Sequence, residues 1–231
     1  MGKHLFITGT GTEVGKTYIT GLIVKKLREA GRHAAYYKAA MSGNARRSDG
    51  SLIPGDALQV KTRSGIAQPL EEMYSYAYET AVSPHLAARI EGNPVELRRV
   101  LNDFDWLCRS YDYVTAEGSG GILCPLRFDG QQIQLTDFIT ARNLPCLIVS
   151  DARLGAINAV VLTAEYMKRH GIHARGIIFN RFEPGNILHE DNLLMCEALT
   201  GLQVAFCVQN GATDLDIPPA ILEGLYADSG G

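Results

Sequence analysis

The sequence predicts an α/β protein of three layers, in which a mostly parallel sheet lies between helices on both of its faces. Short apolar runs alternate along the chain with segments of helical periodicity, and this alternation is typical of parallel strands joined by helices. The runs are apolar almost throughout, as in strands that are buried on both faces. Because no repeat, low-complexity tract or linker interrupts the pattern, we expect one domain over residues 1–231, with a flexible tail at the last few residues.

The expected elements follow in a regular order. Strands are predicted at the apolar runs 5–8, 33–38, 111–117, 146–150 and 176–180. Helices are predicted, from apolar residues at helical spacing and from proline and glycine at the ends, over 16–30, 84–91, 94–109 and 156–170. In parallel sheets ligands bind at the carboxyl ends of the strands, so the polar residues that follow these strands are the functional candidates.

The composition favours a soluble cytoplasmic protein. Of the 231 residues, 46% are hydrophobic and 20% charged, and the net charge is −3, so we expect no nucleic-acid partner and no acidic membrane surface. No apolar run approaches the ~18 residues of a transmembrane helix, and the N-terminal strand leads directly into a glycine-rich loop, so we expect no signal peptide. The five cysteines are widely spaced, which indicates small buried thiols in a reducing compartment.

The strongest functional signal is the segment 9–17, GTGTEVGKT, between the first predicted strand and the first predicted helix. It resembles the Walker A phosphate loop, except that Thr10 stands at the position of the first motif glycine. In such a loop the backbone N–H groups face phosphate oxygens, Lys16 adds a positive charge, and the Thr17 hydroxyl can bind magnesium. A plain glycine turn is the alternative, but strand, loop and helix all fall where the motif requires. The sequence therefore predicts a nucleoside triphosphate site on a fold of the P-loop NTPase type.

Further polar residues follow the strands or begin a helix. Lys38 ends the second predicted strand and Ser42 follows it, which could place a cation and a hydroxyl at the mouth of the pocket; taken alone, a solvated loop lysine is the more common outcome. Asp56 opens a helical segment and is equally compatible with an N-cap and a ligand. Glu117 ends an apolar strand before a glycine-rich segment and resembles a Walker B carboxylate. Together with the Thr17 hydroxyl, two carboxylates can hold Mg²⁺ beside phosphates.

These segments occur together in a known family. GTGTEVGKT, KAAMSG, GDA, SPHLAARIEG, EGSGG and FNR appear in the order and approximate spacing seen in dethiobiotin synthetases, and the resemblance runs from residue 4 to about residue 182. The phosphate loop alone is shared with many ATPases, whereas its combination with Lys38, Ser42 and Glu117 is much more specific. The chain thus resembles a dethiobiotin synthetase over most of its length.

The resemblance implies an ATP- and Mg²⁺-dependent cyclo-ligase of biotin biosynthesis. In that reaction 7,8-diaminopelargonate takes up CO₂ as a carbamate, ATP phosphorylates the carbamate, and the second amine closes a cyclic urea as phosphate leaves. The catalytic residues implied are Thr12, Glu13, Lys16 and Lys38, with Ser42 at the diamine. The metal ligands implied are Thr17, Asp56 and Glu117.

The resemblance also implies a nucleotide site and a homodimer. The nucleotide-binding residues would be Glu13, Val14, Gly15, Lys16, Thr17, Tyr18, Asp56, Glu117, Gly118, Ser119, Gly120, Asn180, Arg181, Val208, Gln209 and Asn210, with Asn180 at the adenine. The family completes its substrate site across the interface between two copies. Here a helix N-terminus at Leu154, Gly155 and Asn158 could receive the substrate carboxylate, although the same helix face could equally be plain core.

The sequence also departs from the family pattern. Ala39 stands where the family has proline, which is expected to loosen the loop at Lys38. Residues 208–210 lack the proline of the purine loop, so the sequence admits other nucleotides. The segment 44–48 is either a solvated loop or brings two arginines near phosphate. Two other functions stay open: a nucleotide switch, against which the lack of a signature lysine in residues 10–12 argues, and a paralogue with a changed amine substrate.

Overall fold

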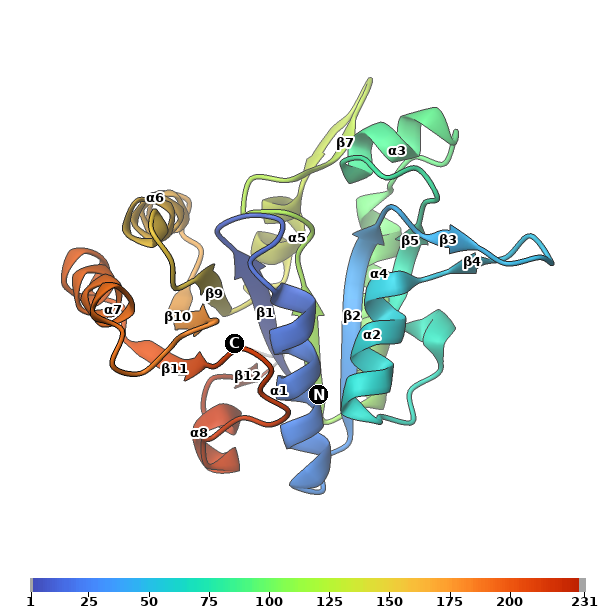
Figure 1. The fold of residues 1–231 in the computed structure, drawn as a ribbon. Helices are drawn as coiled ribbons and strands as arrows, with labels where there is room; N and C mark the ends of the chain where they lie inside the picture. The colour runs from blue at the N-terminus through green and yellow to red at the C-terminus, as the bar shows by residue number, and fades with distance from the viewer. Residues whose placement is uncertain (1, 229–231) are drawn as a thin grey trace.

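A parallel sheet forms the centre of the protein, whose computed structural model describes residues 2–228 (Figure 1). Its strands follow the order β11-β10-β9-β1-β6-β2-β5, and β12 joins as an antiparallel neighbour of β1. The strand bounds are Lys3–Gly9 (β1), Ala34–Met41 (β2), Tyr74–Ala77 (β5), Tyr113–Glu117 (β6), Cys146–Asp151 (β9), Ala174–Asn180 (β10), Val204–Val208 (β11) and Ala227–Asp228 (β12). The mostly parallel sheet and its five expected strands are therefore confirmed.

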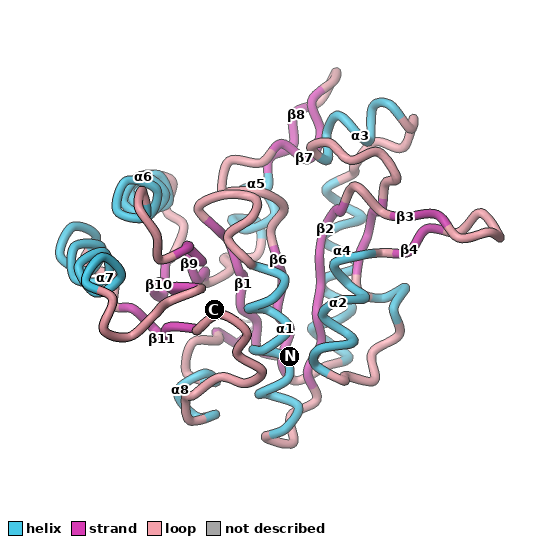
Figure 2. Tube along the Cα trace, in the orientation of Figure 1, coloured by secondary structure: helices cyan, strands magenta, loops and turns pink. Residues whose placement is uncertain are grey.

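Helices cover both faces of the sheet, so the three-layer prediction is confirmed (Figures 1 and 2). One apolar cluster joins Leu5 and Ile7 of β1 to α1, α2 and α8, whereas Phe6 belongs to the cluster with α4 and α5 on the opposite face. A third cluster packs α6 and α7 against β10. The helix bounds are Lys16–Glu29 (α1), Gly55–Ser64 (α2), Leu70–Glu72 (a 3₁₀ turn, η1), Pro84–Ile90 (α3), Leu97–Ser110 (α4), Leu135–Ala141 (α5), Ala156–Arg169 (α6), Ile187–Thr200 (α7) and Pro219–Glu223 (α8).

Two neighbouring tyrosines of β2 show how strictly the sheet separates its two faces. Tyr36 and Tyr37 are both fully buried, and successive side chains of a strand point to opposite faces. Tyr36 packs in the cluster of α1 and α2. Tyr37 packs with Phe104 and Phe138 on the other face.

Two small hairpins extend from this body. One pairs Ala45–Arg46 (β3) with Leu52–Ile53 (β4) and projects into solvent, and the other pairs Pro125–Phe128 (β7) with Gln132–Gln134 (β8) beside α3 (Figure 1). In the first hairpin the Arg46 guanidinium pairs with Glu79, with 2.6 Å between Nη2 and Oε2. Residues 45–48 are exposed, as expected of a solvated segment, whereas Asn44 is buried.

The second strand is longer than the sequence predicts. Lys38 was expected at its end, but β2 continues to Met41, because Ala39, Ala40 and Met41 are buried and Ala40 pairs with Tyr76 of β5. Ala39 lies within this regular strand, so the expectation of a loosened loop beside Lys38 is wrong.

Other predictions concern the chain ends and the cysteines. The predicted tail falls on residues 229–231, which lie outside the described residues, whereas residues 227–228 form β12. Among residues 2–228 the cysteines form no disulfide; Cys108, Cys124, Cys146 and Cys196 are buried as expected, whereas Cys207 is partly exposed. In the same part of the chain, no helix combines the length and hydrophobicity needed to cross a membrane.

Candidate active site

A pocket of about 890 Å³ opens at the carboxyl ends of the central strands, where the sheet topology predicts a ligand site. It lies between the loop that joins β1 to α1 and the ends of β2 and β6. The predicted site residues that line it are Thr12, Glu13, Gly15, Lys16, Thr17, Tyr18, Lys38, Ser42, Asp56, Glu117, Ser119, Gly120 and Arg181. Most of the predicted catalytic, metal and phosphate residues thus meet in one place.

The last residue of β10 supports the phosphate loop. Gly15 has a φ of +90°, and a Cβ there would lie 2.1 Å from Asn180 Nδ2, so both the conformation and the close approach require glycine. The same amide donates a hydrogen bond to the Val14 carbonyl at 3.0 Å. Asn180 therefore holds the loop in shape.

Lys16 folds back over the loop that precedes it. Its Nζ donates to the carbonyls of Gly11 at 2.8 Å and Thr12 at 3.4 Å. Burial lowers the pKa of Lys16 to about 8; the charge of Glu117 opposes this shift and that of Lys38 adds to it. A buried ammonium whose protein partners are neutral carbonyls is well placed to receive an anionic phosphate.

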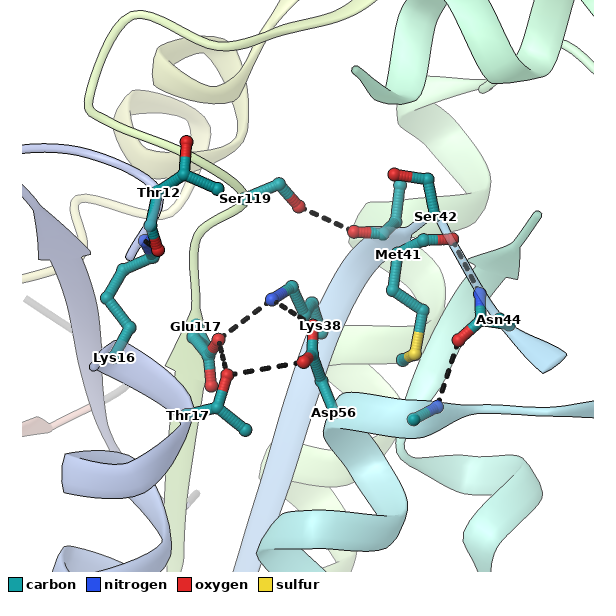
Figure 3. A network of polar contacts seen from close by, with 12 residues as sticks. Thr12, Lys16, Thr17, Lys38, Met41, Ser42, Asn44, Asp56, Glu117 and Ser119 are labelled. Carbon is teal, nitrogen blue, oxygen red and sulfur yellow. Dashed lines mark hydrogen bonds and ion pairs between the residues drawn. The ribbon is translucent and has the colours of Figure 1, made fainter. Parts of the chain in front are cut away.

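Lys38 lies between two carboxylates on the other side of the pocket (Figure 3). Its Nζ is 2.7 Å from Asp56 Oδ2 and 2.8 Å from Glu117 Oε1. The contact with Glu117 follows from the sheet itself, because Lys38 and Glu117 are register partners on β2 and β6. Asp56 reaches the lysine from the first turn of α2, whose N-cap is Pro54. Asp56 is therefore not the N-cap of α2, which excludes one of the two roles that the sequence allowed for it.

The charges in this cluster stabilise one another. Burial acts to lower the pKa of Lys38, but the charges of Glu117 and Asp56 outweigh burial and raise it. Burial acts to raise the pKa of the Asp56 carboxyl, and the Lys38 charge outweighs it and lowers that pKa. Lys38 and Asp56 are therefore both charged at neutral pH.

The same cluster offers oxygen ligands to a metal ion. The Thr17 hydroxyl lies 2.8 Å from Glu117 Oε1 and 3.4 Å from Asp56 Oδ1, so one predicted metal ligand contacts the other two. Between residues 2 and 228, no group of three or more His, Cys, Asp or Glu residues could hold a metal. One hydroxyl with two carboxylates fits Mg²⁺, which keeps waters and phosphate oxygens as its remaining ligands.

Two serines line the rim of the pocket. The Ser42 hydroxyl donates to the Val82 carbonyl ahead of α3, and the Ser119 hydroxyl donates to the Ala40 carbonyl at 2.6 Å. Tyr18 also lines the pocket, with the Arg63 guanidinium 4.3 Å above the centre of its ring. The Ser119 contact joins the glycine-rich segment after β6 to the end of β2.

Several predicted site residues do not line this pocket: Val14, Gly118, Leu154, Gly155, Asn158, Asn180, Val208, Gln209 and Asn210. Gly118 is closely packed, since a Cβ there would lie 2.8 Å from Leu135 Cδ2 and would displace that side chain. Val208 is buried at the end of β11, and residues 209–210 follow as an exposed turn. Leu154 is 84% exposed ahead of α6.

Two polar residues that contact the predicted site residues were not identified by the sequence analysis. Asp151, at the carboxyl end of β9, pairs with the Arg181 guanidinium, which also donates to the Glu13 carbonyl of the phosphate loop at 3.3 Å. Its place at the end of an apolar strand could have revealed it. The Tyr36 hydroxyl donates to Glu117 Oε2 at 3.2 Å. Tyr36 lies within an apolar run, and no local pattern marks it.

The fold and the phosphate loop define a P-loop NTPase. A sequence profile described as an AAA domain matches residues 3–213. Solved structures of similar fold include the MinC:MinD cell division protein complex of Aquifex aeolicus, with a TM-score of 0.57 and 13% identity over 96% of this chain and 86% of that chain. A ParA family ATPase from Chlorobium tepidum TLS has a TM-score of 0.55 and 14% identity over 97% and 89% of the two chains. At these identities the likeness shows the fold alone.

Proteins of similar sequence show which family of P-loop NTPases this chain belongs to. An ATP-dependent dethiobiotin synthetase BioD from Clostridium botulinum (strain Alaska E43 / Type E3) is 43% identical over 226 residues, which cover 98% of this chain and 99% of the relative. A protein with the same name from Brachyspira hyodysenteriae is 45% identical over 217 residues, which cover 94% and 96% of the two chains. The chain belongs to the family of ATP-dependent dethiobiotin synthetases and is an ATP-dependent ligase, so the resemblance found in the sequence is confirmed.

Proposed function

We propose that this protein closes the cyclic urea of dethiobiotin from 7,8-diaminopelargonate, CO₂ and ATP in the presence of Mg²⁺, with release of ADP and phosphate. The observation that carries the proposal is the meeting of Lys16, Thr17, Lys38, Asp56 and Glu117 in one pocket at the strand ends. This arrangement combines a phosphate cradle, an oxygen set suited to a metal and a second cation. Family membership supplies the substrates.

The phosphate loop and Lys16 bind the triphosphate. The helix N-terminus at Lys16 directs N–H groups toward phosphate oxygens. The Lys16 ammonium is oriented by the Gly11 carbonyl at 2.8 Å and moves from neutral to anionic partners when phosphate arrives. Thr17, Asp56 and Glu117 would hold Mg²⁺, which when bound neutralises charge on the phosphates.

Lys38 provides the second cation. A carbamate becomes a good electrophile only when its oxygen carries a phosphoryl group, so two anions must approach each other. Lys38 lines the pocket beside Asp56 and Glu117 and also beside Ser42, and it would hold the carbamate for in-line transfer. Thr12 and Glu13 line the opposite rim and would orient the diamine. In such a reaction positioning and electrostatics supply most of the catalysis.

Asn180 would recognise the base. One N–H of its amide donates to the Val14 carbonyl, and its carbonyl oxygen would accept from the base. An acceptor at this position favours an exocyclic amino group, as adenine carries. Arg181 follows with a φ of +56° and lines the pocket, and residues 208–210 would close the far side of the base.

We further propose a homodimer in which a second copy completes the substrate site. Gly155 is the N-cap of α6 and has a φ of +95°. Apolar side chains are exposed ahead of α6 at Leu154, on α6 at Leu162 and on α7 at Ile187 and Leu194. Gly155 and Asn158 of one copy would receive the substrate carboxylate of the other. The absence of disulfides among residues 2–228 and the net charge of −3 support a cytoplasmic enzyme with small-molecule partners.

The test is phosphate release from ATP with Mg²⁺ and bicarbonate, measured with and without 7,8-diaminopelargonate, together with detection of the cyclic urea by mass spectrometry. Diamine-dependent release with urea formed is the expected result. Release that is independent of the diamine, or nucleotide binding with no turnover, would instead indicate a nucleotide switch or a paralogue with another amine substrate.

A further inference from the structure

The second oxygen of Glu117 has a partner that the proposed chemistry does not use. Tyr36 is fully buried in β2, and its hydroxyl donates to Glu117 Oε2 at 3.2 Å. The main chain of Tyr36 is itself clamped by the buried side chain of Gln68, which accepts from Tyr36 N at 2.8 Å and donates to Tyr36 O at 3.1 Å. The phenol is therefore presented to Glu117 from a fixed position.

The two oxygens of Glu117 thus have separate environments. Oε1 accepts from Thr17 and from Lys38, both at 2.8 Å, and belongs to the pocket. Oε2 accepts from Tyr36 on the interior side. The terminal torsion of a glutamate is broad, and the Glu117 side chain is 0% exposed, so bulk solvent does not reach the second oxygen. Thr17 and Lys38 hold Oε1, and Tyr36 holds Oε2 against rotation of the carboxylate.

We propose that Tyr36 is a positioning residue that fixes Glu117 so that Oε1 alone is offered to the metal. This inference rests on the proposed function, in which Glu117 is a metal ligand. Mg²⁺ demands a near-octahedral shell and accepts few protein oxygens, and a carboxylate free to rotate would present either one oxygen or two. A hydrogen bond to the outer oxygen of a metal-binding carboxylate sets this geometry and affects affinity.

The chain supplies a matched control beside the test residue. Tyr37 is also fully buried, and its hydroxyl donates to the Val100 carbonyl at 3.0 Å and shares a hydrogen bond with Ser75. Its side chain packs on the opposite face of the sheet, and its hydroxyl bonds Ser75 and Val100 rather than Glu117. Tyr36→Phe and Tyr37→Phe therefore each remove one buried hydroxyl from adjacent positions of the same strand.

The experiment measures Mn²⁺ binding to the full-length protein saturated with ADP, from the EPR signal of unbound Mn²⁺, after correction for Mn²⁺ bound by ADP alone. Tyr36→Phe is expected to raise the Mn²⁺ dissociation constant about tenfold or more, whereas Tyr37→Phe stays within about twofold of wild type. Thermal unfolding without metal and ADP affinity in EDTA report the folded fraction of each variant. Equal Mn²⁺ affinity in Tyr36→Phe and wild type, or an equal loss in Tyr37→Phe, would overturn the role of Tyr36.

A second variant separates positioning from general packing. If Tyr36 acts through Glu117, then Tyr36→Phe adds no further loss of Mn²⁺ affinity in a Glu117→Gln background, and a full additional loss would contradict the proposal. In turnover assays Tyr36→Phe should raise the apparent KM for Mg²⁺ while kcat at saturating Mg²⁺ stays nearly constant. The Mn²⁺ measurement needs no diamine, so failure of the proposed ligase reaction is distinguishable; a wild-type protein that binds no Mn²⁺ would overturn both the metal site and Tyr36.

Discussion

Lys16 and Lys38 face the same pocket and are almost equally buried, at 4% and 5% exposure, yet their environments are opposite. Lys16 lies on the phosphate loop with neutral carbonyl partners, and its pKa is lowered to about 8, chiefly by burial. Lys38 lies inside a strand between two carboxylates, and their charges raise its pKa despite burial. Within the described part of the chain, Lys16 on the phosphate loop therefore has no carboxylate partner within hydrogen-bond distance, whereas Lys38 in the strand cluster has two.

This difference suits the two lysines to different tasks. The phosphate loop is suited to bind an anion from outside the protein, because the carbonyls orient the Lys16 ammonium but do not neutralise its charge. In the cluster of Lys38, Asp56 and Glu117 the charges already pair with one another. A metal or carbamate that binds there must therefore replace some of these contacts. Binding of phosphate should therefore depend mainly on Lys16, and the reaction step on Lys38.

The largest expected effect is that of Lys38→Met on turnover. Loss of a cation that acts on charge developing in the transition state should lower kcat by on the order of 10²- to 10³-fold. Nucleotide affinity should change only a few-fold, because Lys38 is not part of the loop. Steady-state ADP formation with the diamine, compared with calorimetric ADP binding, measures both. Turnover close to wild type would remove Lys38 from the mechanism.

Lys16→Met should act chiefly on binding. Removal of a charge-assisted hydrogen bond to phosphate costs about 1.5–3 kcal/mol, or roughly a 10- to 100-fold loss of ATP affinity. Lys26→Met is the control, since Lys26 lies in the last turn of the same helix and pairs with Asp214 at 3.2 Å. Calorimetric titration with a nonhydrolysable ATP analogue gives the comparison. Equal losses in the two variants would contradict the assignment.

The lowered pKa of Lys16 predicts a protonation linkage. At about pH 7 the group is already charged in the free protein, whereas above about pH 8 it is largely neutral. Phosphate favours the ammonium form, so nucleotide binding at about pH 9 should take up a proton and weaken as pH rises further. Calorimetry in buffers of different ionisation heats measures the uptake. Lys16→Met should abolish this contribution, and an uptake that survives the substitution would assign it to another group.

A smaller effect is expected for Asp151→Asn. Asp151 holds Arg181, which donates to the Glu13 carbonyl, so the substitution loosens the loop without removing a phosphate ligand. A partly exposed ion pair contributes about 0.2–1 kcal/mol, and ATP affinity should fall less than about fivefold. Glu79→Gln, which breaks the hairpin pair with Arg46, is a control that should leave affinity unchanged.

The sequence predicts those parts of the site that depend on local order. The phosphate loop is one continuous segment between a strand and a helix, so Lys16 and Thr17 could be placed from spacing alone. Lys38 was identified, but its position within the strand was wrong, because the extension to Met41 depends on pairing with β5. The role of Tyr36 could not be predicted, since it follows from the pairing of β2 with β6. Asp151 follows an apolar strand and was overlooked.

The register that pairs Lys38 with Glu117 also has a consequence for folding. These two residues are 79 positions apart in the chain, and the contact of Asn180 with the phosphate loop at Val14 spans 166 positions. Contacts between distant segments must await closure of the intervening chain. In a refolding molecule the charge cluster can thus form only after β2 has docked beside β6, and the loop gains its support only after β10 has docked. Both halves of the pocket therefore depend on the correct order of the strands.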